Sequence, residues 1–211
     1  LCRDWSSDVC SSDLLEPLHL LFMEDPIAPE NLDAYQRIQD AVAIPLAAGE
    51  RMSTIWGLRP LIERDLVDVI QPDTGRAGGI MQMKKMAAMA ESHGITVAPH
   101  SGSLGPIAEF AALHLLAAIP NALMLERIEN DWVGRNEVIS APPKRDGGFL
   151  VVPTVPGLGV DIVEDAIARY PSQRNVSISA GGYEPGTEKE YLYQQVRLRR
   201  AASFGAGKPR K

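Results

Sequence analysis

Cysteine is nearly absent from this chain of 211 residues, because both of its cysteines, Cys2 and Cys10, lie among the first fourteen residues. The rest of the chain therefore offers no thiolate nucleophile, disulfide or cysteine metal ligand. Long apolar runs are also lacking, and none approaches the ~18 residues of a membrane span. A signal peptide is not predicted, because no basic segment is followed by a long apolar stretch. We expect a cytoplasmic protein with no membrane partner.

A strong excess of positive charge is missing as well. The net charge is −6, so nucleic-acid binding is not expected. Apolar content of 45% and charged content of 23% are ordinary for a soluble globular protein. Basic residues near the end of the chain, between Arg197 and Lys211, are more simply interpreted as a solvated terminus than as a binding site.

Three segments differ in composition. Residues 1–14 are rich in Ser and Asp, lack periodicity and resemble one reading frame of a sequencing-library adapter, so we interpret them as an assembly artefact; a disordered tail is the alternative. Residues 15–170 carry regular strand and helix patterns and are expected to form a partial (β/α) barrel domain. Residues 171–211 are polar and rich in turn-forming residues, and are interpreted as a C-terminal extension.

Ionisable residues recur at nearly equal intervals, each at the end of a short apolar run. The intervals are 26, 23, 27 and 26 residues, and the series is Glu24, Glu50, Asp73, His100 and Glu126. A period of about 25 to 30 residues is the length of one strand-plus-helix unit of a (β/α)8 barrel. In such barrels the strand ends converge on one mouth, so the spacing predicts one pocket that holds all of these side chains.

Helical patterns fill the intervals between these residues. The spacing predicts helices over Glu30–Val42, from Ser53 or Thr54 to about Arg64, and over Ile80–His93 and Ile107–Ala118. Such alternation implies a parallel sheet, and no strand pair shows a two-residue hairpin turn. A doubly wound sheet is the competitor, but it gathers its site at one switch point, and a Gly-x-Gly-x-x-Gly motif after a strand is missing.

The pattern weakens after Glu126. A short strand is expected within Gly147–Pro153 and a short helix over Val163–Tyr170. Methionines on the helix from Ile80 are expected to fill the core, and Lys84 and Lys85 to form a solvated face. The other histidines, His19, His93 and His114, are interpreted as structural.

The chemistry of the series follows from its residue types. Clustered carboxylates repel one another unless a cation neutralises them, so Glu24 and Glu50 are candidate Mg²⁺ ligands rather than solvated strand-end acids. Asp73 can fix the tautomer of His100, whose other nitrogen can then exchange a proton with substrate. Glu126, if protonated, can donate a hydrogen bond to a developing oxyanion.

Several motifs in order resemble the enolase superfamily, in its mandelate racemase-like branch, from about Leu15 to Tyr170. The motifs are Phe22–Pro26, Pro45–Met52, Gln71–Asp73 with Gly78–Gly79, Ala98–His100 and Leu125–Arg127. Residues 47–52 and 98–106 are most similar to the galactonate dehydratase group. The resemblance implies an α/β fold, the C-terminal portion (about strands 4 to 8) of an enolase-type barrel. It also implies a homo-oligomer for the full-length protein.

The resemblance further implies a hydro-lyase that uses Mg²⁺ to help remove the proton α to the carboxylate of a small sugar acid. Glu24 and Glu50 match the second and third metal ligands, Asp73 and His100 match the acid/base dyad, and Glu126 matches the eighth-strand acid. Loss of the β-hydroxyl would then give a 2-keto-3-deoxy sugar acid.

Parts of the family pattern have no counterpart here: the first metal ligand, an Asp on the third strand; the second-strand Lys motif; and the capping domain that shapes specificity. A racemase or cycloisomerase on the same scaffold therefore stays open, as does a non-catalytic relative. We expect these 211 residues alone to be poorly soluble, because a half barrel exposes an unpaired strand edge, and inactive. Mg²⁺-dependent turnover of an aldonic acid by the soluble chain would contradict this.

Overall fold

Short apolar strands alternate with helices through most of the computed structural model, which describes residues 14–28, 31–101, 105–128 and 133–171. The interpretations of residues 1–14 and 171–211 fall almost wholly outside these ranges. The described helices and strands all belong to one unit, Ser6–Tyr170. In this part of the chain no helix is both long and apolar enough to span a bilayer.

Parallel strands form the centre of the unit, in the order β1-β2-β3-β4. They are β1 (Met23–Glu24), β2 (Leu46–Ala48), β3 (Val69–Ile70) and β4 (Thr96–Val97). A single parallel bridge from Val97 to Ala122 continues the sheet. The strand expected before Glu126 is reduced to this bridge, although the Glu126 backbone N–H still donates to the Pro99 carbonyl at 3.3 Å.

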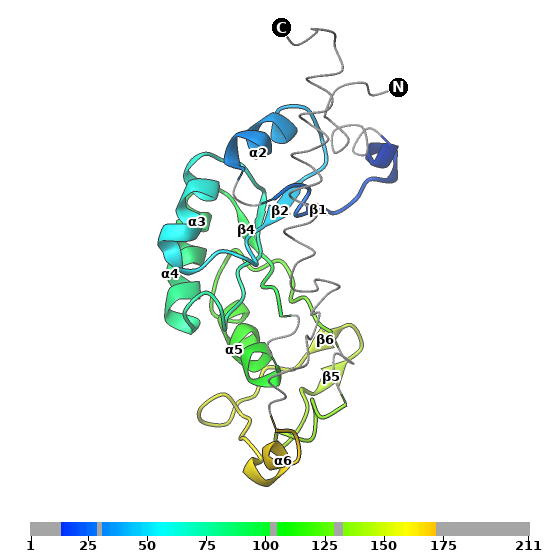
Figure 1. Cartoon of the computed structure of the whole chain (residues 1–211), viewed down its shortest axis with the longest axis vertical. Coiled ribbons are helices and arrows are strands. Elements are labelled where there is room, and N and C mark those ends of the chain that lie inside the picture. The colour runs from blue at the N-terminus through cyan, green and yellow to red at the C-terminus, as the bar shows by residue number, and fades with distance from the viewer. Residues whose placement is uncertain (1–13, 29–30, 102–104, 129–132, 172–211) are drawn as a thin grey trace, which may run out of the picture. The chain divides into compact units, whose positions relative to one another are not determined.

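Helices connect the strands and lie along one side of them (Figure 1). They are α2 (Leu32–Gln39), α3 (Thr54–Glu63), α4 (Ile80–Glu91) and α5 (Pro106–Leu116), with the short 3-10 helix η1 (Glu16–Leu18) before β1 and α6 (Glu164–Ala168) after the sheet. Each sequence-predicted helix is present but shorter. At the start of α2, for example, the Asn31 side chain accepts a hydrogen bond from the Ala34 backbone at 3.2 Å and caps the helix there.

Side chains of the strands alternate between two apolar clusters, as the two-residue repeat of a strand requires. Leu46, Ile70 and Val97 join the large cluster formed with the helices. Ala47, Val69 and Ala98 form a small cluster on the other face. The small-cluster face is the one that would line the inside of a barrel, so the strands curve with their helices outside, as the β/α alternation predicts.

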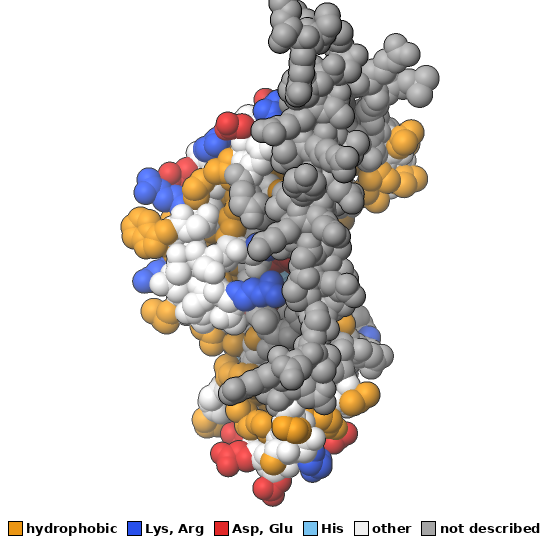
Figure 2. Space-filling view, in the orientation of Figure 1, with side chains coloured by type: hydrophobic (Ala, Val, Ile, Leu, Met, Phe, Trp, Pro, Cys, Tyr) orange, Lys and Arg blue, Asp and Glu red, His pale blue; other side chains and the backbone are white. Residues whose placement is uncertain are grey.

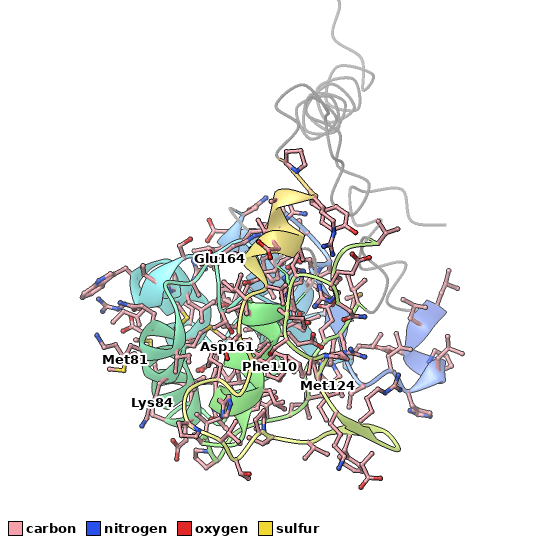
Figure 3. All side chains as sticks on the ribbon, turned by 90° about the horizontal axis from the view of Figure 1, so that it is seen from below. Met81, Lys84, Phe110, Met124, Asp161 and Glu164 are labelled. Atoms are coloured by element: carbon pink, nitrogen blue, oxygen red, sulfur yellow. The ribbon has the colours of Figure 1, made fainter. Side chains whose placement is uncertain are left out.

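The helix α4 shows how one face packs and the other meets solvent. Met83 and Met86 are buried, as expected of core methionines, whereas Met81 is 69% exposed. Met81 and Lys84 project outward from α4 in Figure 3, while Phe110 of α5 lies in the interior. The expectation that methionines here fill the core is therefore wrong for Met81, which shares the solvated face with Lys84.

A hairpin follows the sheet, contrary to the expectation that no strand pair has a two-residue turn. Strands β5 (Arg145–Asp146) and β6 (Phe149–Leu150) pair in antiparallel fashion. Gly147, in the turn between them, has a φ of 57°, a conformation that two-residue hairpin turns favour and that glycine adopts without strain. The strand expected within Gly147–Pro153 is shorter because the two glycines form the turn.

The short helix α6 begins with acidic side chains. Glu164 and Asp165 lie in its first turn, where the positive end of the helix dipole favours them. Figure 2 shows acidic side chains around this part of the molecule. These residues are exposed, and they lie on a helix that follows the sheet rather than at the ends of its parallel strands.

Candidate active site

The five predicted site residues, hereafter the strand-end cluster, all lie at or just beyond the carboxyl ends of parallel strands. Glu24 is the last residue of β1, and the others follow β2, β3, β4 and the bridge at Ala122. Gly49 allows the turn that places Glu50: its φ is 135°, and a Cβ there would lie 3.0 Å from Leu58 Cδ1 and 3.2 Å from the Gln71 backbone nitrogen. The fold therefore brings the series to one edge of the sheet.

Asp73 and His100 form the best-defined contact of the cluster. The Asp73 side chain is fully buried, and its Oδ1 accepts hydrogen bonds from the backbone N–H groups of Gly75 at 2.8 Å and Arg76 at 3.3 Å. Its Oδ2 lies 2.9 Å from His100 Nδ1. A carboxylate only accepts hydrogen bonds, so Nδ1 carries a proton. Nε2 faces the site, where it also carries a proton when it pairs with the Glu50 carboxylate, and it must lose that proton before it can act as a base.

Two further carboxylates surround the other nitrogen of His100. Nε2 lies 3.1 Å from Glu50 Oε2 and 3.8 Å from Glu126 Oε2. The pKa of His100 is raised chiefly by the hydrogen bond that its Nδ1 donates to Asp73, with the charges of Glu126 and Glu50 adding to the rise and burial opposing it. The imidazole is thus a stronger base than an isolated histidine.

Glu126 is held between the strand end and the site. The Ser101 hydroxyl donates a hydrogen bond to the Glu126 backbone carbonyl. Burial raises the pKa of the Glu126 carboxyl most, the nearby His100 lowers it, and the charges of Glu24 and Glu50 raise it further. Glu24 is exposed, and among the described residues it acts on the rest of the cluster through its charge, whereas the other four side chains are in direct ion-pair or hydrogen-bond contact.

A second line of contacts, between Tyr35, Asp25, Arg51 and Glu50, adjoins the cluster. Arg51 Nε lies 3.3 Å from Glu50 Oε1 and 3.9 Å from Asp25 Oδ2. The hydroxyl of buried Tyr35 lies 3.4 Å from Asp25 Oδ1 and 3.1 Å from the Ile27 carbonyl, and its single proton is shared between these two acceptors. Burial, and then the charge of Glu50, raise the pKa of Asp25 to about 6, while Arg51 opposes the rise.

The donor chemistry suits Mg²⁺, but the number of ligands is incomplete. Glu24 and Glu50 supply carboxylate oxygens, the ligands that Mg²⁺ prefers. Oε2 of Glu126 is buried without a hydrogen-bond partner among the described residues, so this edge of the sheet also holds a carboxylate oxygen that can accept a further ligand or hydrogen bond. Within the described ranges, however, no three acidic, histidine or cysteine side chains are arranged to hold a metal. The two predicted ligands therefore fit the ion as part of a larger set.

Another group of charged side chains, hereafter the arginine cluster, lies apart from the predicted series. Glu109 on α5 is fully buried, and its two oxygens lie 2.5 Å from Arg127 Nε and 3.0 Å from Arg135 Nη2. Arg135 is itself 2% exposed. This cluster joins α5 to the chain that follows Glu126.

Sequence reasoning assigns no role to Asp25, Arg51 or Arg127, although each of them stands next to a site residue in one of the family-like motifs. Their adjacency to site residues is the signal that could have indicated them. The structural interpretation of His93 and His114 agrees with their contacts, to Asp65 Oδ1 and to the Leu158 carbonyl, both at 3.0 Å. Lys84 and Lys85 are exposed on α4, as expected.

A cavity of about 500 Å³ lies between α5, the segment 123–127 and the β5–β6 hairpin. Its walls are mainly apolar, with Leu113, Leu123 and Phe149 among them, and none of the strand-end cluster lines it. The titratable groups suited to chemistry are at the strand ends, so the candidate active site is the strand-end cluster and not this cavity.

Comparison with known proteins supports the fold described above. The family model described as enolase C-terminal domain-like matches residues 8–166. The chain belongs to this enolase family. Both the resemblance drawn from its motifs and the expectation of a partial enolase-type barrel are confirmed.

Relatives of this enolase-family chain include a protein named as a sugar-acid dehydratase and an enolase structure with a bound sugar acid. A D-galactonate dehydratase of Ralstonia pickettii (strain 12J) is 39% identical over 160 residues, which cover 71% of this chain and 41% of that protein. The crystal structure of an enolase from Pantoea ananatis with bound D-gluconate and Mg is 34% identical, with a TM-score of 0.72, and the match covers 79% of this chain and 40% of that one.

A mandelate racemase/muconate lactonizing enzyme from Sulfitobacter sp. is 34% identical, with a TM-score of 0.76, over 81% of this chain and 42% of that one. The enolase-family chain thus spans about two fifths of the length of these relatives. The rest of each relative lies outside the region that matches this chain.

Proposed function

We propose that the complete natural protein containing these residues is a Mg²⁺-dependent sugar-acid dehydratase. Its substrate is an aldonic acid, and its reaction removes the proton on the carbon next to the carboxylate and the hydroxyl on the following carbon. The observation that carries the proposal is the orientation of His100, whose Nδ1 is held by buried Asp73 at 2.9 Å while Nε2 faces the carboxylates of the site. The 39% identity to a D-galactonate dehydratase supports the substrate class.

His100 acts as the base in this scheme. Nε2 takes the proton from the α-carbon, and the resulting imidazolium is stabilised by the Asp73 carboxylate at Nδ1. The electron pair left on the α-carbon then expels the β-hydroxyl, which departs as water after receiving a proton from an acid supplied by another part of the complete protein. The enol that results tautomerises to a 2-keto-3-deoxy acid.

The remaining acids would act at the substrate carboxylate, two of them through Mg²⁺ and one through a hydrogen bond. Glu24 and Glu50 would bind Mg²⁺, which as a Lewis acid supplies positive charge where negative charge develops. Glu126 faces the same region with a pKa raised chiefly by burial, and in its protonated form it can donate a hydrogen bond to a carboxylate oxygen of the substrate. Arg51 and Asp25 lie behind Glu50 rather than at the reacting atoms.

The test uses the complete natural protein with Mg²⁺ and D-galactonate or D-gluconate in D₂O, followed by proton NMR. We expect a 2-keto-3-deoxy acid to accumulate, with deuterium at carbon 3 from ketonisation of the enol. Exchange at carbon 2 without a keto product would indicate a racemase on the same scaffold. Neither product nor exchange with any aldonic acid would indicate a non-catalytic relative and would contradict the proposal.

A further inference from the structure

Glu50 presents its two carboxylate oxygens to different partners. Oε1 accepts a hydrogen bond from Arg51 Nε at 3.3 Å, whereas Oε2 lies 3.1 Å from His100 Nε2. Oε1 of Glu50 is therefore held by Arg51, whereas Oε2 faces His100 in the strand-end cluster. A carboxylate held at one oxygen loses less rotational freedom when its other oxygen takes up a ligand.

Arg51 is in turn held by groups on another strand and helix. Asp25 Oδ2, beyond β1, lies 3.9 Å from Arg51 Nε, and Asp25 Oδ1 accepts the hydroxyl of Tyr35 on α2. Tyr35 is fully buried, and the Ile27 carbonyl lies 3.1 Å from its hydroxyl and shares the single proton with Asp25. The side chains of Arg51, Asp25 and Glu50 are 29%, 19% and 20% exposed, so these contacts are partly shielded from water, and the hydrogen bond between Arg51 and Glu50 lies at the surface.

We propose that Arg51 is a positioning residue that fixes the carboxylate of Glu50 for metal binding, and that Asp25 holds Arg51 in place. This inference rests on the proposed function, in which Glu50 is a Mg²⁺ ligand. Groups that orient a metal ligand without touching the metal commonly change metal affinity about 10- to 100-fold when they are replaced.

A simple charge effect predicts the opposite result, which makes the inference testable. The Arg51 guanidinium is positive and close to Glu50, so through charge alone it would repel Mg²⁺, and its removal would tighten binding. Through positioning, its removal frees the Glu50 carboxylate and weakens binding. The sign of the change in Mg²⁺ affinity therefore separates the two effects.

The experiment measures the Mg²⁺ dissociation constant of the complete natural protein by titration calorimetry, for the unsubstituted protein and for Arg51→Met, Arg51→Lys, Asp25→Asn and Glu50→Gln. Arg59→Met is the matched control, because Arg59 pairs with Glu63 on the exposed surface of α3. The unfolding midpoint of each variant in EDTA is measured in parallel, since a purely structural role would lower it.

We expect Arg51→Met to raise the dissociation constant about tenfold or more, with little change of the midpoint in EDTA. Arg51→Lys should restore little of the affinity, because an ammonium cannot reproduce the Nε contact, and Asp25→Asn should give a smaller loss. Arg59→Met should bind Mg²⁺ normally.

Three outcomes would overturn the inference. Normal or tighter binding by Arg51→Met, while Glu50→Gln loses Mg²⁺, contradicts positioning but leaves the proposed function intact. A large fall of the Arg51→Met midpoint in EDTA, with no loss of affinity in folded Arg51→Lys, assigns Arg51 to the fold. Normal binding by Glu50→Gln, or none by the unsubstituted protein, overturns the proposed function and the inference with it.

Discussion

The two groups of charged side chains in this molecule differ in how their charges balance. In the arginine cluster, one buried carboxylate, Glu109, lies between the guanidinium groups of Arg127 and Arg135. In the strand-end cluster, three carboxylates contact a single imidazole, that of His100, and a fourth, Glu24, lies at the same edge of the sheet. Removing one member of a buried ion pair leaves an uncompensated charge and destabilises the fold, whereas carboxylates crowded together are stabilised by a cation or a proton that relieves their repulsion.

The difference predicts opposite responses to substitution. Neutralising a residue of the arginine cluster should cost stability, because it leaves charge without compensation. Neutralising an exposed acid of the strand-end cluster, such as Glu24, should cost metal binding while leaving the folded state as stable as before. The predictions below test that contrast on the complete natural protein, from the largest expected effect to the smallest.

The largest effect is expected from Asp73→Asn. An amide at Oδ2 can donate to His100 Nδ1 and so favour the imidazole tautomer with its proton on Nε2, which cannot act as a base. We expect the rate of sugar-acid dehydration to fall about a hundredfold to ten-thousandfold, the usual contribution of a general base. Steady-state kinetics measure the loss, and Mg²⁺ binding should persist. A rate within a few-fold of the unsubstituted protein would show that Asp73 does not set the tautomer.

The next effect concerns stability. Glu109→Gln leaves Arg127 and Arg135 facing an uncharged amide in a buried place, and breaking a buried ion pair from one side typically costs about 3–5 kcal/mol. Urea unfolding followed by circular dichroism measures the change. The same measurement on Glu24→Gln in EDTA is the control, and we expect no loss there because removing one of several crowded carboxylates relieves repulsion. Equal losses in the two variants would remove the distinction between the clusters.

Mg²⁺ itself should stabilise the protein through the strand-end cluster. A ligand that binds only the folded state adds about 2.7 kcal/mol when its free concentration is one hundred times the dissociation constant. We expect the unfolding midpoint to rise with Mg²⁺ in the unsubstituted protein and in Arg59→Met, and to rise much less in Glu24→Gln. If Glu24→Gln keeps the full rise, Glu24 is not a ligand.

The smallest effect is expected at the surface. Arg59 and Glu63 form an exposed pair on α3, 2.6 Å apart, which water and salt screen. Arg59→Met should leave both the unfolding midpoint and the turnover rate unchanged within error. A clear loss of stability would show that exposed pairs matter here as much as the arginine cluster does.

Much of the fold could be read from the sequence because its elements repeat. The spacing from Glu24 to Glu126 reflects strand and helix lengths, so it predicted the parallel strands and the side chains at their ends. Helix ends were less predictable, since a cap such as Asn31 competes with apolar periodicity over a few residues. The hairpin after Asp146 was missed because two adjacent glycines also suit an open loop.

The contacts around the site could not be read in the same way. That Asp73 would meet His100 followed from neighbouring strands, but the contact between Arg51 and Asp25 depends on the turn after β1, where Asp25 has a φ of 41°. The arginine cluster was missed because Glu109 lies in a very apolar helix, and nothing in the periodicity predicts which arginines its buried carboxylate meets.

The most direct test of the central claim, that the strand-end cluster transfers a proton through His100, is His100→Asn in D₂O. The complete natural protein and this variant are compared with Mg²⁺ and an aldonic acid by proton NMR. We predict that the variant binds Mg²⁺ but loses both the 2-keto-3-deoxy product and any exchange at carbon 2, whereas the unsubstituted protein forms the product. Product formation by His100→Asn at a rate near that of the unsubstituted protein would contradict the claim.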